Sequence, residues 1–164
     1  MKRYLSVLCC LLYTELALGQ VLLPNKDQPI GLSQSVFGLG LSAGYLSGFG
    51  LSFRHHLPSV ISYQIVAGII KTDAKSNYNL GGQIQYDLVR GEGTRFYGCG
   101  GMGYFYSGES GHNDLEGPFR IGLGIGAVGG RMESFSISGE LNFTYFSDGS
   151  ILPLPQLSAH YYFY

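Results

Sequence analysis

Apolar and polar residues alternate along most of this chain, and this period of two limits its fold more than any other feature. Between residues 78 and 88, large apolar side chains take nearly every even position, and polar or small ones take the odd positions. Residues 135–145 repeat the pattern, and residues 37–42 and 119–126 carry shorter versions of it. Successive side chains of a β-strand point to opposite faces, so each segment predicts a strand with one apolar and one polar face.

Four further segments show weaker alternation and bring the number of predicted strands to eight: residues 49–57, 61–70, 96–106 and 157–164. Most of the eight are long enough to cross a bilayer when tilted, which takes roughly 9–11 residues. The 26 glycines argue against helices, because each interior Gly costs about 1 kcal/mol relative to Ala. The sequence therefore predicts an all-β protein, a closed antiparallel up-and-down β-barrel of eight strands.

The connections between the predicted strands differ in length. Residues 57–59, 90–94 and 129–133 form short Gly- or Pro-containing turns. The connections between them are mostly longer, and the tight turn at 45–48 breaks this pattern. Longer polar connections are expected at 72–77, 107–117 and 147–155. Outer-membrane barrels keep short turns in the periplasm and long loops outside, which predicts that both termini are periplasmic.

The placement of charge distinguishes a membrane barrel from a soluble one, because both alternate. Arg54, Asp87, Arg120 and Glu140 share a face with Gly, Ser, Asn, Gln and Thr. An eight-stranded barrel has an interior just wide enough for side chains, so this small and polar face suits the inside. We therefore expect the apolar face to contact lipid, in preference to a soluble barrel with the opposite orientation. A closed barrel also satisfies every backbone polar group without water.

The polar residues expected to point inward form the candidate site: Arg54, His56, Asp87, Arg120, Glu140 and His160. We interpret them as an ion-pair and hydrogen-bond network that fills the lumen. The alternative is a narrow pore, or a pocket for a small solute or lipid, that uses the glycines on the same face.

Other motifs are weaker. Residues 98–103 and 124–129 match the Gly-x-Gly-x-x-Gly pattern, but they lie in Gly-rich strands without a following helix, so no cofactor is expected. His112, Asp114 and Glu116 read as a solvated loop rather than a metal site, since three residues supply too few ligands. Adjacent His55 and His56 point to opposite faces of a strand and cannot share a metal ion. The net charge of −1 offers no surface for nucleic acid.

No catalytic constellation is recognisable in the sequence, so an enzyme is not expected. A lipid-modifying enzyme with a Ser nucleophile and a His base near the rim is the alternative that would change this interpretation.

The N-terminus has the order of an export signal. Basic residues precede an apolar run, and Ala17 and Gly19 supply the small residues that a signal peptidase reads. We expect a signal peptide at residues 1–19, rather than a buried N-terminal helix or strand. Cys9 and Cys10 suggest a lipoprotein as a minor alternative, although the residues before Cys9 are too large for that motif.

The rest of the chain divides into an irregular periplasmic leader at residues 20–35 and the barrel at residues 36–164. Cys99 is the one cysteine after the predicted signal peptide, which excludes an internal disulfide.

The segment from Leu157 to Tyr164 resembles the terminal strand of bacterial outer-membrane proteins, since it alternates and ends in aromatic residues. With it, residues 36–164 resemble the small outer-membrane β-barrels of the OmpA and OmpX type. The resemblance implies a bacterial outer-membrane location, surrounding lipid, and recognition of this segment by the barrel-insertion machinery. It implies little about activity, and we expect a structural or surface-interaction role.

Overall fold

The computed structural model describes residues 35–71, 75–91, 93–109, 119–130 and 135–163. The predicted signal peptide at 1–19 and the leader up to residue 34 lie outside the described residues. The same holds for His112, Asp114, Glu116 and Tyr164.

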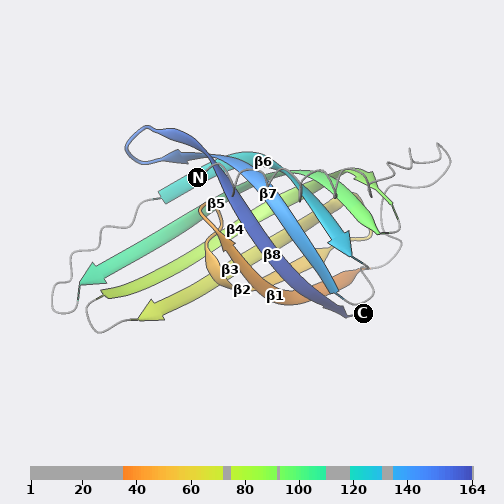
Figure 1. Cartoon of the computed structure of the whole chain (residues 1–164), viewed down its shortest axis with the longest axis horizontal. Coiled ribbons are helices and arrows are strands. Elements are labelled where there is room, and N and C mark those ends of the chain that lie inside the picture. The colour runs from red at the N-terminus through yellow and green to blue at the C-terminus, as the bar shows by residue number, and fades with distance from the viewer. Residues whose placement is uncertain (1–34, 72–74, 92, 110–118, 131–134, 164) are drawn as a thin grey trace, which may run out of the picture.

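Eight antiparallel strands form one closed barrel in which each strand pairs with its neighbours along the chain (Figure 1). Their bounds are β1 (Val36–Gly44), β2 (Phe49–His56), β3 (Ile61–Lys71), β4 (Lys75–Arg90), β5 (Thr94–Glu109), β6 (Phe119–Gly130), β7 (Phe135–Phe146) and β8 (Ile151–Phe163). Pairing of β1 with β8, from Phe37 opposite Phe163 onward, closes the sheet. The predicted up-and-down barrel of eight strands is confirmed.

Within the described residues, no helix is long and apolar enough to span a membrane.

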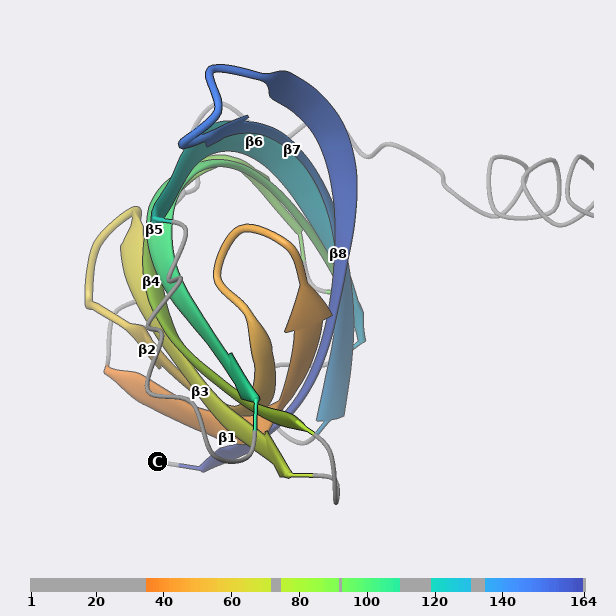
Figure 2. The ribbon, with the colours of Figure 1, turned by 90° about the vertical axis from the view of Figure 1, so that its left-hand side faces the viewer.

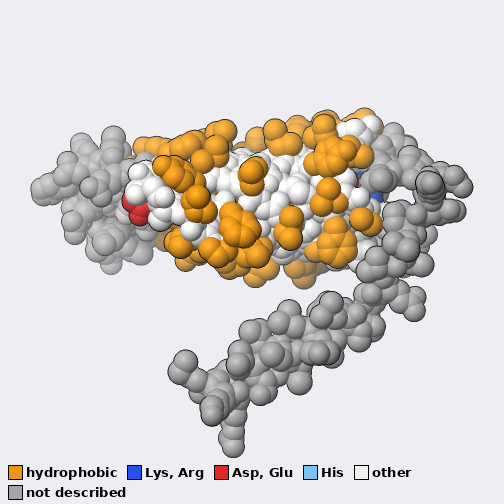
Figure 3. Space-filling model, turned by 90° about the horizontal axis from the view of Figure 1, so that it is seen from above, with side chains coloured by type: hydrophobic (Ala, Val, Ile, Leu, Met, Phe, Trp, Pro, Cys, Tyr) orange, Lys and Arg blue, Asp and Glu red, His pale blue; other side chains and the backbone are white. Residues whose placement is uncertain are grey.

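The apolar face of the barrel points outward. Leu80, Leu123 and Phe143 are 60%, 72% and 57% exposed, whereas Asp87 and Glu140 are 1% and 6% exposed. Figure 3 shows hydrophobic side chains spread along the barrel wall. The alternation therefore places the apolar set outside and the polar set inside, as the sequence predicts.

The barrel has two different ends. Val36 and Phe163 lie at one of them, the terminal end, together with the last residues of β2, β4 and β6. The last residues of β1, β3, β5 and β7 lie at the other, the loop end. In the turn between β7 and β8, the hydroxyl and backbone N–H of Ser150 donate to the Asp148 carboxylate, which lowers the pKa of that carboxyl.

Three loops at the loop end are shorter in the structure than the sequence analysis predicted. β4 already begins at Lys75, β5 runs to Glu109, and these two residues pair with each other. The polar residues of the long β4–β5 hairpin continue the backbone pairing beyond the apolar part, so composition alone does not mark the strand ends.

β8 likewise begins earlier than predicted, at Ile151, and includes Pro153 and Pro155. β1 stops at Gly44, so residues 151–155 pair with β7 alone. Proline lacks an N–H and is tolerated along the unpaired edge of a strand.

Candidate functional site: the filled lumen

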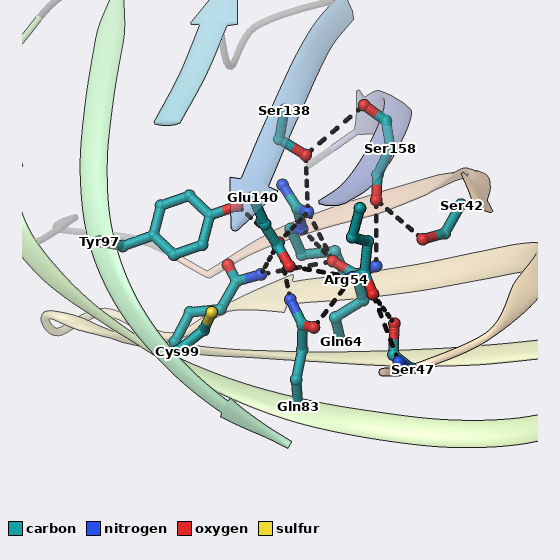
Figure 4. Close-up of polar contacts among 12 residues, drawn as sticks. Ser42, Ser47, Arg54, Gln64, Gln83, Tyr97, Cys99, Ser138, Glu140 and Ser158 are labelled. Carbon is teal, nitrogen blue, oxygen red and sulfur yellow. Dashed lines mark hydrogen bonds and ion pairs between the residues drawn. The ribbon is translucent and has the colours of Figure 1, made fainter. Parts of the chain in front are cut away.

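The Glu140 carboxylate, on β7, lies at the centre of the lumen (Figure 4). Its Oε1 accepts hydrogen bonds from the Tyr97 hydroxyl at 2.6 Å and from Gln83 Nε2 at 2.8 Å. Its Oε2 accepts one from Gln156 Nε2 at 2.9 Å. The donors come from β4, β5 and β8, so one buried carboxylate ties together four strands around the barrel.

Arg54 on β2 supplies the cation of this centre and is fully buried. Its Nη2 lies 4.0 Å from Glu140 Oε1, its Nε donates to Gln64 Oε1 at 2.9 Å, and Nη2 also donates to Ser138 Oγ at 3.1 Å. A buried charge is tolerated when it is paired and hydrogen-bonded, as here. The central network is defined by these residues: Arg54, Gln64, Gln83, Tyr97, Ser138, Glu140 and Gln156.

Asp87 forms a second ionic cluster nearer the terminal end. Its carboxylate accepts from both Arg90 and Arg95. The register between β4 and β5 shifts between Asp87 and Val89, so the regular strand pairing is interrupted beside this cluster. Arg95 Nη1 also donates to Gln85 Oε1 at 2.9 Å, and Gln85 contacts Gln64 of the central network at 3.4 Å. The two clusters therefore form one continuous polar interior.

Two Ser–His pairs lie in the same interior. His160 Nε2 lies 2.8 Å from Ser52 Oγ, and His56 Nδ1 lies 2.6 Å from Ser62 Oγ. All four residues are fully buried. Both hydroxyls therefore lie enclosed within the barrel and not at its rim, where the sequence analysis placed the nucleophile of a lipid-modifying enzyme.

Two large tyrosines share the interior, and each lies against a glycine of the neighbouring strand. Tyr97 pairs with Gly126, where a Cβ atom would come within 2.5 Å of the tyrosine ring. Tyr162 pairs with Gly38, where a Cβ would come within 2.6 Å. These inward glycines therefore provide the space that the two rings fill.

The loop end is closed by the turn between β1 and β2, residues 45–48, here named the inward turn. Looking along the barrel from this end, Figure 2 shows the turn lying across the middle of the opening. Leu46 and Ser47 are 1% and 0% exposed. Ser47 donates from its Oγ to Gln156 Oε1 at 2.9 Å, which joins the turn to the central network.

Glycines of the wall allow the turn to bend inward. A Cβ on Gly81 would lie 2.1 Å from the Ser47 carbonyl oxygen, and one on Gly103 would lie 2.2 Å from that of Leu46. Gly48 itself has a φ of 108°, a conformation that residues with a side chain rarely adopt. The tight turn was predicted, but its position inside the lumen was not.

The structure places the six predicted site residues in different surroundings. Arg54 and Glu140 meet in the central network, His56 and His160 lie in the same interior, and Asp87 belongs to the second cluster. Arg120 points inward but lies apart from both clusters, half-buried at the loop end, where its Nη1 donates to the Tyr45 carbonyl oxygen at 3.0 Å.

Sequence reasoning missed several partners inside the lumen: Gln64, Gln83, Gln85, Arg95, Tyr97, Gln156 and Tyr162. Arg95 was missed because β5 was expected to begin at residue 96, whereas it begins at Thr94. Tyr97 was missed because aromatic side chains were assigned to the lipid face. The signal that could have found Tyr97 is its odd position, shared with Arg95 and Cys99 and opposite in parity to outward Phe96.

Among the described residues, no three His, Cys, Asp or Glu side chains come together as a metal site requires.

Comparison with solved structures shows the same architecture elsewhere. The N-terminal β-barrel domain of Pseudomonas aeruginosa OprF matches with a TM-score of 0.54 and 15% identity, covering 81% of this chain and 99% of that one. A major outer membrane protein from Thermus thermophilus matches with a TM-score of 0.52 and 15% identity over 79% and 99%. The chain has the fold of the small outer-membrane β-barrels. The resemblance seen in the sequence is confirmed at this level.

A third barrel of this fold is Ail, the attachment invasion locus protein of Yersinia pestis, in complex with the heparin analogue sucrose octasulfate. It matches with a TM-score of 0.51 and 14% identity over 81% of this chain and 99% of that one. No protein-family model matches the sequence, and no curated protein matches it either.

Proposed function

We propose that this chain is a bacterial outer-membrane barrel with a closed lumen, which acts as a structural or surface-interaction protein and not as a pore. Support for the membrane location comes from the exposed apolar wall, which includes Leu80, Leu123 and Phe143. In water such a surface would be unfavourable, at roughly 25 cal/mol per Å² of apolar area. In lipid it is the expected surface of a spanning barrel.

The proposal that the lumen is closed rests on one observation, the continuous set of side-chain contacts that crosses it. The chain of contacts runs from Arg54 through Glu140 and Gln156 to Ser47 of the inward turn. Ions would have to displace hydrogen-bonded groups at two successive levels, the central network and the inward turn. Eight strands leave no room for a separate aqueous path beside them.

The proposed orientation places the terminal end in the periplasm and the loop end outside the cell. In this orientation β8 engages the barrel-insertion machinery through Leu157 and the residues that follow it. The loop end, with the inward turn and the β7–β8 turn, then meets the surroundings of the cell.

Conductance in planar bilayers tests the closed lumen. The refolded full chain is expected to give no steady single-channel steps, after an unboiled gel has shown the mobility of a folded barrel. Steady steps that bulky substitutions at inward-facing Gly122 or Gly124 abolish would instead establish a pore.

A further inference from the structure

The barrel wall has a notch at the loop end, above the inward turn. Pairing of β1 with β8 ends at Gly44, and pairing of β2 with β3 begins only at Leu51. Residues 151–155 of β8 therefore pair with β7 alone, and residues 68–71 of β3 pair with β4 alone. The gap between these two unpaired strand edges is here named the side notch.

A cavity of about 650 Å³ extends from the side notch to the β4–β5 hairpin, which supplies five of its lining residues. Pro155 and Leu157 line one edge, Ile70 lines the other, and Tyr45 and Phe49 lie beside the inward turn at its base. The lining is thus largely apolar and aromatic, and it contains no carboxylate.

Arg120 is the one cation among the lining residues. Its guanidinium carbon lies 3.7 Å from the centroid of the Phe105 ring and 5.0 Å from that of Phe146. Nη1 donates to the Tyr45 carbonyl oxygen, while Nε is buried with no partner among the described residues. Within this part of the chain no carboxylate lies within ion-pair distance of Arg120, unlike Arg54, Arg90 and Arg95.

A guanidinium in apolar surroundings favours an anion that can accept its free N–H groups. The aromatic rings hold the guanidinium plane by cation–π contact but accept no hydrogen bond along its edge. The apolar edges on both sides of the notch favour hydrocarbon in the same ligand. The two requirements together describe a molecule with an acidic head group and an alkyl chain.

We propose that the side notch binds an anionic amphiphile, with the acidic head group on Arg120 and the alkyl chain against Ile70, Phe49 and Leu157. The cavity reaches the outward-facing side chain of Leu157, so an alkyl chain enters from the side without leaving the lipid. This route of entry rests on the proposed membrane location, whereas the head-group site does not.

Calorimetric titration of the refolded full chain, in a non-ionic detergent with dodecyl phosphate as the probe, tests the head-group site. We expect about one bound molecule per barrel and at least about a tenfold loss of affinity in Arg120→Gln, since a charge-assisted hydrogen bond contributes about 1.5–3 kcal/mol. Lys71→Gln is the matched control, because Lys71 is the last residue of the β3 edge, is exposed to solvent, and does not line the cavity. It should bind as the parent does.

Ethyl phosphate tests the requirement for a chain, and it should bind at least about a hundredfold more weakly, because each buried CH₂ contributes about 0.8 kcal/mol. Equal affinity for ethyl phosphate, or unchanged affinity in Arg120→Gln, would overturn the proposal. The gel mobility of every unboiled sample shows separately whether the barrel is folded. Loss of binding through misfolding is thereby distinguished from loss of binding at the side notch.

The source of the ligand is tested with a fluorescent reporter, since the chain contains no tryptophan. Phe49→Trp places one tryptophan at the base of the notch. Quenching that saturates with brominated phosphatidic acid in vesicles, and that Arg120→Gln weakens, supports the site and assigns it to a membrane lipid. Quenching by a brominated alkyl phosphate alone supports the site for a soluble amphiphile, and quenching by neither contradicts it.

Discussion

The Tyr97 hydroxyl donates a 2.6 Å hydrogen bond to Glu140 Oε1, across 43 positions of sequence and from β5 to β7. The intervening strand, β6, contributes glycines at its inward positions beside them. The contact shows how the lumen is built. A carboxylate, a phenol and side-chain amides from different strands meet beside a strand whose inward positions are glycines.

Removing that hydroxyl should destabilise the barrel. We expect Tyr97→Phe to lower the free energy of unfolding by about 1.5–3 kcal/mol, because the acceptor is a buried carboxylate. Urea titration in lipid vesicles, followed by gel mobility, measures the change. Tyr104→Phe on the same strand is the control, since Tyr104 points outward and is 48% exposed. Equal losses in the two variants would contradict a specific role for the Tyr97 hydroxyl.

Arg54 and Glu140 should be energetically coupled. Either Arg54→Met or Glu140→Gln leaves a buried charge without its partner, and each should cost about 3–5 kcal/mol. The double variant should lose less than the sum of the two by about 1 kcal/mol or more, as residues within one network do. A strictly additive double variant would show that the two charges are stabilised independently.

Gly81→Val should expel the inward turn, because its Cβ would lie 2.1 Å from the Ser47 carbonyl oxygen. The measurement is labelling of Ser47→Cys by a water-soluble maleimide in a background where Cys9, Cys10 and Cys99 are each replaced by Ser. We expect at least about a tenfold faster reaction in Gly81→Val, which corresponds to about 1.4 kcal/mol of easier opening. Gly98→Val is the control, since a Cβ there meets nothing within 4 Å.

A charged residue on the outer wall should destabilise the barrel strongly at mid-height and only slightly at the rim. Leu123→Arg, at a position that is 72% exposed, should cost about 2–4 kcal/mol in a bilayer, whereas Ile69→Arg at the loop end should cost about 0–1 kcal/mol. Folding yield and urea stability in vesicles measure both. A barrel that works in water would tolerate Leu123→Arg as well as Ile69→Arg.

The sequence predicts the strand number and the orientation of each face, because a period of two is a local property that survives in every strand. Strand ends are less predictable, as Lys75, Glu109 and Ile151 show. Their pairing depends on whether a neighbouring strand is still present, and that information is not in the segment itself.

The site was predictable in its polarity but not in its contacts. Which polar residues meet depends on the register between strands, so Gln83 and Gln156 could not be assigned to Glu140 before the barrel was closed. For Arg120, the sequence predicts the direction of the side chain but not its distance from the network. Its inward direction follows from alternation, but its separation from the network follows from its height in the barrel, which alternation does not encode.

The two strand edges beside the notch carry residues that discourage pairing between molecules. Pro153 and Pro155 supply no N–H to an approaching strand, and Lys71 adds a charge to the opposite edge. An open edge of this kind would otherwise be a template for a strand from a second barrel. The shortened β1–β2 hairpin thus leaves the wall open to a ligand, while the two prolines and Lys71 keep neighbouring molecules from joining sheets edge to edge.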